Sequence, residues 1–97
     1  MNIEITIWDN DLKRIRAIER NVALAMRSLN LKGAVKIISE PPLLSREKLL
    51  NRVPVLEIND HYWSLKPQTE ISESQCRELL SFIFPHGQDA FSKEEAC

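Results

Sequence analysis

The sequence is poor in the residues on which small reactive or metal-binding domains depend. Its 97 residues include two cysteines, two histidines and two glycines. Two glycines are too few for a glycine-rich loop that cradles phosphate. Cys76 and Cys97 also lack the spacing to the histidines that zinc ligands show. We therefore expect no metal site and no cofactor.

Long hydrophobic runs and an excess of one charge are also missing. No apolar segment approaches the roughly 20 residues that span a bilayer, and the first residues, MNIEITIWDN, do not have the pattern of a signal peptide. The 13 basic and 14 acidic side chains give a formal net charge of −1. This balance does not favour nucleic acid or a membrane as an obligatory partner. We expect a cytoplasmic protein with reduced thiols.

What the sequence does contain is four strand-like runs. Isoleucines alternate with polar residues in IEITIW, AVKII is rich in β-branched residues, and the ND of VPVLEIND is typical of a hairpin turn into HYWSL. Pro54 cannot donate a hydrogen bond, so the third strand is expected to begin just after it. Strands are predicted at residues 3–8, 34–38, 55–58 and 61–65.

Three helices are expected between and after these strands. Apolar residues spaced three and four apart predict helices at about 12–30, 43–52 and 73–84. The predicted caps are Asp9, Asn10 or Asp11 for the first helix, Ser45 for the second, and a Ser72–Gln75 capping box for the third. Gly33 is expected to form a left-handed end to the first helix, and Pro41 and Pro42 to close the second strand.

The order of these elements predicts the fold class. A strand, a long helix and a second strand favour a parallel pair with a right-handed crossover, and the two-residue turn requires the last two strands to be antiparallel. The expectation is an α/β fold, β-α-β-α-β-β-α, with a mixed four-stranded sheet and three helices. It occupies one domain, residues 1–84, followed by a polar tail, residues 85–97.

This order, with a proline before the third strand, resembles the thioredoxin-like superfamily, most closely the small thioredoxin- and glutaredoxin-like proteins. IEITIW, ERNVALAM, VPVLEINDHYW and the capped last helix carry the resemblance, which covers about residues 3–84. The resemblance implies that Pro54 follows a cis peptide bond and faces the active-site loop. It also implies that Pro54 shapes a groove where substrate backbone docks.

The resemblance places the family's two catalytic cysteines at Leu12 and Ile15, and residues 6–20 contain no cysteine. A thiol at the start of a helix is what makes the family's nucleophile reactive. We therefore expect a redox-inactive module that binds or adapts a protein partner and is not an enzyme. The predicted partner-binding residues surround the former active-site loop: Trp8, Asp9, Asn10, Asp11, Leu12, Arg52, Val53 and Pro54.

Other hypotheses stay open at this stage. Cys76 or Cys97 could replace the lost pair in a thiol-dependent redox protein, although Cys76 lies in the apolar register of the last helix. The chain could also be a structural subunit of a larger assembly, paired through its sheet edge or first helix, or a homodimer. A basic stripe on that helix is either a solvated face or a dock for an acidic protein; it contains Lys13, Arg16, Arg20 and Arg27.

Overall fold

The structure is a computed structural model that describes residues 3–85. Four strands and three helices follow one another along the chain: β1 (Ile3–Trp8), α1 (Leu12–Ser28), β2 (Gly33–Ile38), α2 (Pro41–Arg46), β3 (Val55–Ile58), β4 (His61–Ser64) and α3 (Glu73–Ile83). The predicted α/β order is confirmed. None of the helices in this part of the chain is long and apolar enough to cross a membrane.

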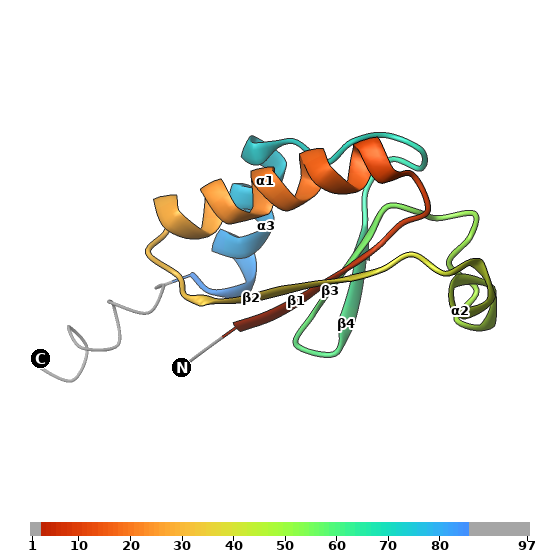
Figure 1. Ribbon diagram of the computed structural model, residues 1–97. Helices are drawn as coiled ribbons and strands as arrows, with labels where there is room; N and C mark the ends of the chain where they lie inside the picture. The colour runs from red at the N-terminus through yellow and green to blue at the C-terminus, as the bar shows by residue number, and fades with distance from the viewer. Residues whose placement is uncertain (1–2, 86–97) are drawn as a thin grey trace, which may run out of the picture.

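The strands form one mixed sheet in the order β2-β1-β3-β4 (Figure 1). β1 and β2 are parallel, with Ile5 opposite Val35. β3 runs antiparallel to both β1 and β4. The parallel pair and the terminal hairpin are those that the sequence predicts. β2 and β4 are therefore the two edges of the sheet.

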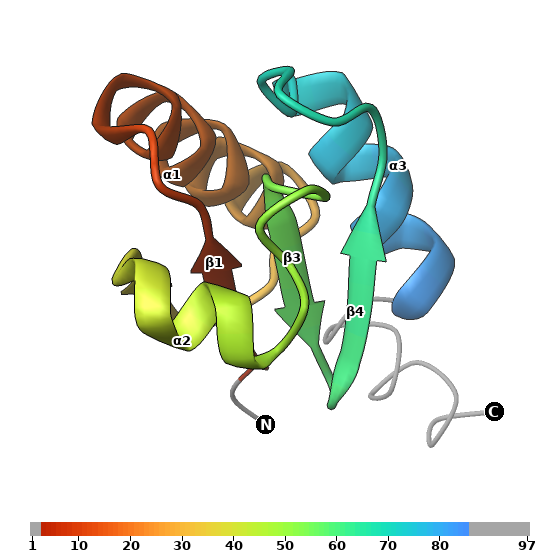
Figure 2. The ribbon, with the colours of Figure 1, turned by 90° about the vertical axis from the view of Figure 1, so that its right-hand side faces the viewer.

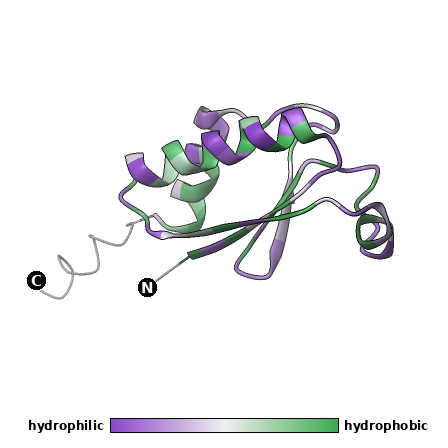
Figure 3. Cartoon of the chain, in the orientation of Figure 1, coloured by the Kyte–Doolittle hydropathy of each residue, from purple (hydrophilic) through white to green (hydrophobic). Residues whose placement is uncertain are grey.

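Helices α1 and α3 lie side by side on one face of the sheet (Figures 1 and 2). Alternation along β1 directs three isoleucines to this face, where they pack with the apolar stripes of both helices. We call this cluster the main core, and its fully buried members include Ile5, Ile7, Ile18, Val22 and Leu80. Figure 3 shows green, hydrophobic stretches on both helices and along the strands.

Among the described residues, the opposite face of the sheet is covered at one end, by α2 (Figure 2). There Leu44 and Leu49 pack on Trp8, Val53 and Val55 in a second, smaller cluster. Further along this face the residues are mainly polar, and a hollow of about 340 Å³ opens between them. Glu4, Thr6, Glu57, Asn59 and Asp60 line that hollow.

Local sequence signals place most of the element ends correctly. Ser72 accepts a hydrogen bond from the Gln75 N–H, and the Gln75 side chain accepts one from Ser72, so the predicted capping box is confirmed. Asn59 and Asp60 both have positive φ, which is typical of a tight hairpin turn. Asp11 is the cap of α1, as its side chain accepts a hydrogen bond from the Arg14 N–H at 3.0 Å.

Several predicted boundaries are wrong, and α2 spans Pro41–Arg46 where the sequence predicts residues 43–52. Pro41 and Pro42 begin α2 and do not close a strand, because the first turn of a helix does not use the N–H that proline lacks. Ser45 consequently lies inside this helix and caps nothing. Gly33 is the first residue of β2, where a Cβ would clash with the Ile3 carbonyl oxygen. The left-handed residue after α1 is Asn30 instead.

Candidate partner-binding site at the start of α1

The predicted partner-binding residues come together at one end of the sheet. The end of β1 leads into α1, and Trp8 pairs with Val55 at the start of β3, so the two chain segments lie side by side (Figure 2). The Val53–Pro54 peptide bond is cis, as the resemblance implies. We call residues 8–14 together with residues 49–55 the corner.

Four of these residues are inside the protein. Asp9 and Val53 have no exposed surface, Trp8 is 7% exposed, and Pro54 is buried. They fix the shape of the corner but have little or no surface to offer a partner in this conformation. Of the apolar side chains among the predicted partner-binding residues, Leu12 is the one that is exposed.

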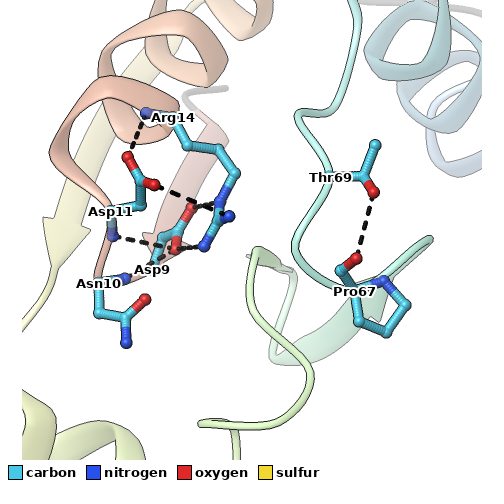
Figure 4. Close-up of polar contacts among 6 residues, drawn as sticks. All are labelled: Asp9, Asn10, Asp11, Arg14, Pro67 and Thr69. Atoms are coloured by element: carbon cyan, nitrogen blue, oxygen red, sulfur yellow. Dashed lines mark hydrogen bonds and ion pairs between the residues drawn. The ribbon is translucent and has the colours of Figure 1, made fainter.

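An ion pair inside the corner fixes the start of α1 (Figure 4). The Arg14 guanidinium donates from Nη2 to Asp9 Oδ1 at 2.6 Å and from Nε to Oδ2 at 2.7 Å, a two-pronged contact. The hydrogen bonds to Asp9 raise the pKa of Arg14 above its ordinary value. The backbone N–H groups of Asn10 and Asp11 also donate to Asp9 Oδ1, so this carboxylate holds the whole turn.

The backbone of Val53 is already fully used by the chain itself. Its N–H donates to the Leu49 carbonyl at 3.1 Å, and its carbonyl accepts from the Gln68 N–H at 2.8 Å. Gln68 lies between Pro67 and Thr69, in a segment that faces the start of α1 (Figure 4). An extended peptide could bond to Val53 only after displacing these bonds, so the corner is not an open docking groove for backbone.

The exposed part of the site is Asn10, Asp11, Leu12 and Arg52. Leu12 is 63% exposed at the first position of α1. Arg52 donates to the Ser64 hydroxyl at 3.3 Å, which directs its guanidinium toward β4. One apolar side chain among polar neighbours has the composition of a small interface, with an apolar centre and a polar rim.

Two aromatic side chains extend this region over the open face of the sheet. Trp8 Nε1 donates to Glu57 Oε1 at 3.0 Å, and the ring of Trp8 meets that of Tyr62 edge to face at 6.0 Å. Burial beside Glu57 and Glu47 raises the pKa of Tyr62. Trp63 points to the other face and packs against the main core, as alternation along a strand requires.

The thiol hypothesis meets an unfavourable environment at Cys76. This residue belongs to the main core rather than to the corner, and it is 1% exposed. Burial, assisted by the charge of Glu73, raises the pKa of Cys76 to about 12, so the neutral thiol predominates near pH 7. Cys97 and His86 lie outside the described residues, as do all but the first residue of the expected tail, residues 85–97.

The remaining charged features are dispersed. The basic stripe Lys13, Arg16, Arg20 and Arg27 is exposed along α1, as its spacing predicts. Within residues 3–85, no group of three or more histidine, cysteine or acidic side chains is arranged to hold a metal ion.

Sequence reasoning missed two contributors to the corner, Arg14 and Gln68. For Arg14, the available signal was its position five residues after Asp9. This spacing crosses the helix cap, where the Arg14 side chain can fold back onto Asp9. The backbone bond from Gln68 to Val53 depends on a loop and left no pattern in the sequence. Comparison with known proteins adds no relative to this geometry, since no family model, curated protein or solved structure matches the chain.

Proposed function

We propose that the chain is a thioredoxin-like, redox-inactive module that binds a protein partner through Asn10, Asp11, Leu12 and Arg52. The observation that carries the proposal is the state of the first turn of α1. Where the resemblance puts a reactive thiol, Leu12 presents an exposed apolar side chain, and Ile15 is buried in the protein. The position that would perform chemistry is thus occupied by a residue that can only make contacts.

The arrangement of the elements agrees with this proposal. A parallel β1-α1-β2 unit, an antiparallel β3-β4 hairpin and a proline just before β3 are the features on which the resemblance rests. The rigidity of the corner also favours binding. Because the Asp9–Arg14 ion pair and the capping bond from Asp11 hold the turn, little conformational entropy is lost when a partner contacts Leu12.

The lack of a free backbone at Val53 shapes the expected mode of binding. A peptide that docks by strand pairing needs unpaired N–H and carbonyl groups, and those of Val53 are bonded to Leu49 and Gln68. The partner is therefore expected to contact side chains. An apolar pocket for Leu12 with a basic group facing Asp11 would match the exposed surface.

The test compares two exposed leucines on one helix. Leu12→Asp should abolish co-purification of the partner from a lysate of source cells. Leu24→Asp is the matched control, because Leu24 is also exposed on α1 but lies outside the site. Circular dichroism should show that both variants are folded. Equal loss of the partner with both variants, or with neither, would contradict the proposed surface.

A separate assay tests whether the module is redox-inactive. The wild-type chain should not accelerate the reduction of insulin disulfides above the rate with dithiothreitol or glutathione alone. Measurable turnover that disappears in Cys76→Ser or Cys97→Ser would replace the binding proposal with the thiol-dependent alternative.

A further inference from the structure

The edge strand β2 has a surface that the proposed site does not use. Within residues 3–85, β2 pairs with β1 on one side only; it is six residues long, whereas the other edge, β4, has four. Its residues are mostly exposed, including Ile37, which is 39% exposed on the face that the helices cover elsewhere. Long edge strands with apolar side chains readily pair with another strand.

The hydrogen bonds to β1 show which backbone groups of β2 point away from β1. The carbonyl of Lys32 accepts from Ile3, and that of Ile38 accepts from Asp9. In a parallel pair the same side of a strand is used at every second residue, so Ala34 and Lys36 also point toward β1. The N–H and carbonyl groups of Val35 and Ile37 therefore point away from the sheet.

From this geometry we infer that β2 pairs antiparallel with β2 of a second copy, centred on Val35. In this register the two Val35 residues face each other and exchange both backbone hydrogen bonds. Ile37 of each copy lies opposite Gly33 of the other, so the larger side chain meets a residue without one. Each Ala34 lies opposite Lys36 of the second copy.

Charge selects this register over its neighbours. Centring the pair on Lys36 would place the two Lys36 side chains opposite each other. Centring it on Ala34 would place Lys36 opposite Lys32 of the second copy. Like charges directly opposite each other destabilise a strand pair. The register centred on Val35 avoids both and still uses most of the strand.

The same register also brings opposite charges together. Glu4 is adjacent to Ala34 within one chain, because the two residues are partners in the β1-β2 pair. Lys36 of the second copy, lying opposite Ala34, can extend across its methyl group toward Glu4. Glu4 and Lys36 are both exposed, and both line a hollow of about 330 Å³ on this face of the sheet. By symmetry the contact occurs twice.

The first experiment measures self-association of the full chain by sedimentation velocity over a range of concentrations. The wild type should form a dimer. Val35→Pro should be monomeric, because it removes an N–H that points away from β1 and that the proposed pair needs. A wild type that is monomeric at every concentration, or a dimer that persists in a folded Val35→Pro variant, would overturn the inference.

Charge exchange provides a test that does not depend on backbone disruption. Lys36→Glu should raise the dissociation constant about tenfold, since two like-charged contacts replace two favourable ones. The double variant Glu4→Lys with Lys36→Glu should restore it. Lys66→Glu is the control, as it makes the same change of charge on an exposed loop. Failure of the double variant to recover would contradict the register.

Cross-linking then checks the register directly in a Cys97→Ser background. Val35→Cys should be joined efficiently by a short bismaleimide reagent, because the paired Cα atoms lie about 5.5 Å apart. Ile37→Cys on the same strand should react poorly, since its counterpart lies about 14 Å away along the strand. Equal cross-linking at both positions would rule out the register.

Discussion

The main core and the corner are stabilised in different ways. The main core is almost wholly apolar and is enclosed by three elements, the sheet, α1 and α3. Four buried apolar residues of the corner, Trp8, Leu49, Val53 and Val55, pack with Leu44 of the short helix α2. The turn of the corner is held by the ion pair of Asp9 and Arg14. Apolar packing tolerates small shifts, whereas a buried ion pair requires fixed geometry. The difference explains how a small domain can present Leu12 on a rigid turn.

The largest expected effect comes from removing the ion pair that holds the corner. Arg14→Met should lower the free energy of unfolding by about 3–5 kcal/mol, because it leaves the fully buried Asp9 carboxylate without its cation. Asp9→Asn should cost less, since the Arg14 side chain retains some exposure and its charge can turn toward water. Urea denaturation measures both values.

Two further variants control this result. Arg20→Met removes an exposed cation from the same helix and should change stability by less than about 0.5 kcal/mol. In the double variant of Asp9→Asn with Arg14→Met, the cost should be smaller than the sum of the single costs. Additive costs would mean that the two residues are not coupled, contrary to the geometry of Figure 4.

A cavity in each region should sharpen the comparison. Ile18→Ala in the main core should cost about 3 kcal/mol and speed amide exchange throughout the protein, because both α1 and the sheet lose a shared contact. Leu44→Ala should instead speed exchange mainly in α2 and residues 47–53, since its cluster contacts few other elements. Uniform protection loss in Leu44→Ala would show that corner and core unfold as one unit.

How far the sequence predicts these regions depends on the range of the interactions. Periodicity and caps act over a few residues, so the strands, the capping box of Ser72 and Gln75, and the hairpin turn could be predicted. The burial of Asp9 could not, because an aspartate before a helix looks like any exposed cap until Arg14 folds back onto it.

The sequence predicts where the candidate site lies, but not which of its residues are exposed to solvent. Its eight residues do meet at one end of the sheet, since the β1-β3 pairing brings Trp8 beside Val55. Which of them reach solvent depends on α2 and on the Gln68 segment, both of which pack over Val53 from elsewhere in the chain. Periodicity within the segment 51–60 contains no information about those two covers.

The titration of Cys76 tests the apolar character of the main core. Folding raises the pKa of Cys76 to about 12 from an ordinary value near 9, so only the unfolded chain ionises readily between those values. The stability that depends on the neutral thiol is complete below about pH 9 and is lost as the pH rises toward 12. Cys76→Ala removes this contribution.

The measurement is the difference in unfolding free energy between the wild type and Cys76→Ala as a function of pH. The wild type should lose about 1.4 kcal/mol per pH unit relative to the variant in that range. Using the difference cancels the titration of Tyr62 and of every other group that both proteins share. A constant difference would indicate that water reaches the thiol in the native state.

The smallest expected effect compares the two tryptophans, one from each region. Trp8 donates from Nε1 to Glu57, whereas the buried Nε1 of Trp63 has no hydrogen-bond partner within the described residues. Replacing each with phenylalanine removes similar apolar area, so the difference isolates the hydrogen bond. Trp8→Phe should cost about 1 kcal/mol more than Trp63→Phe, because it loses a bond and leaves Glu57 unpaired. If both variants lose the same unfolding free energy in thermal denaturation, apolar packing, and not this hydrogen bond, stabilises the corner as it does the main core.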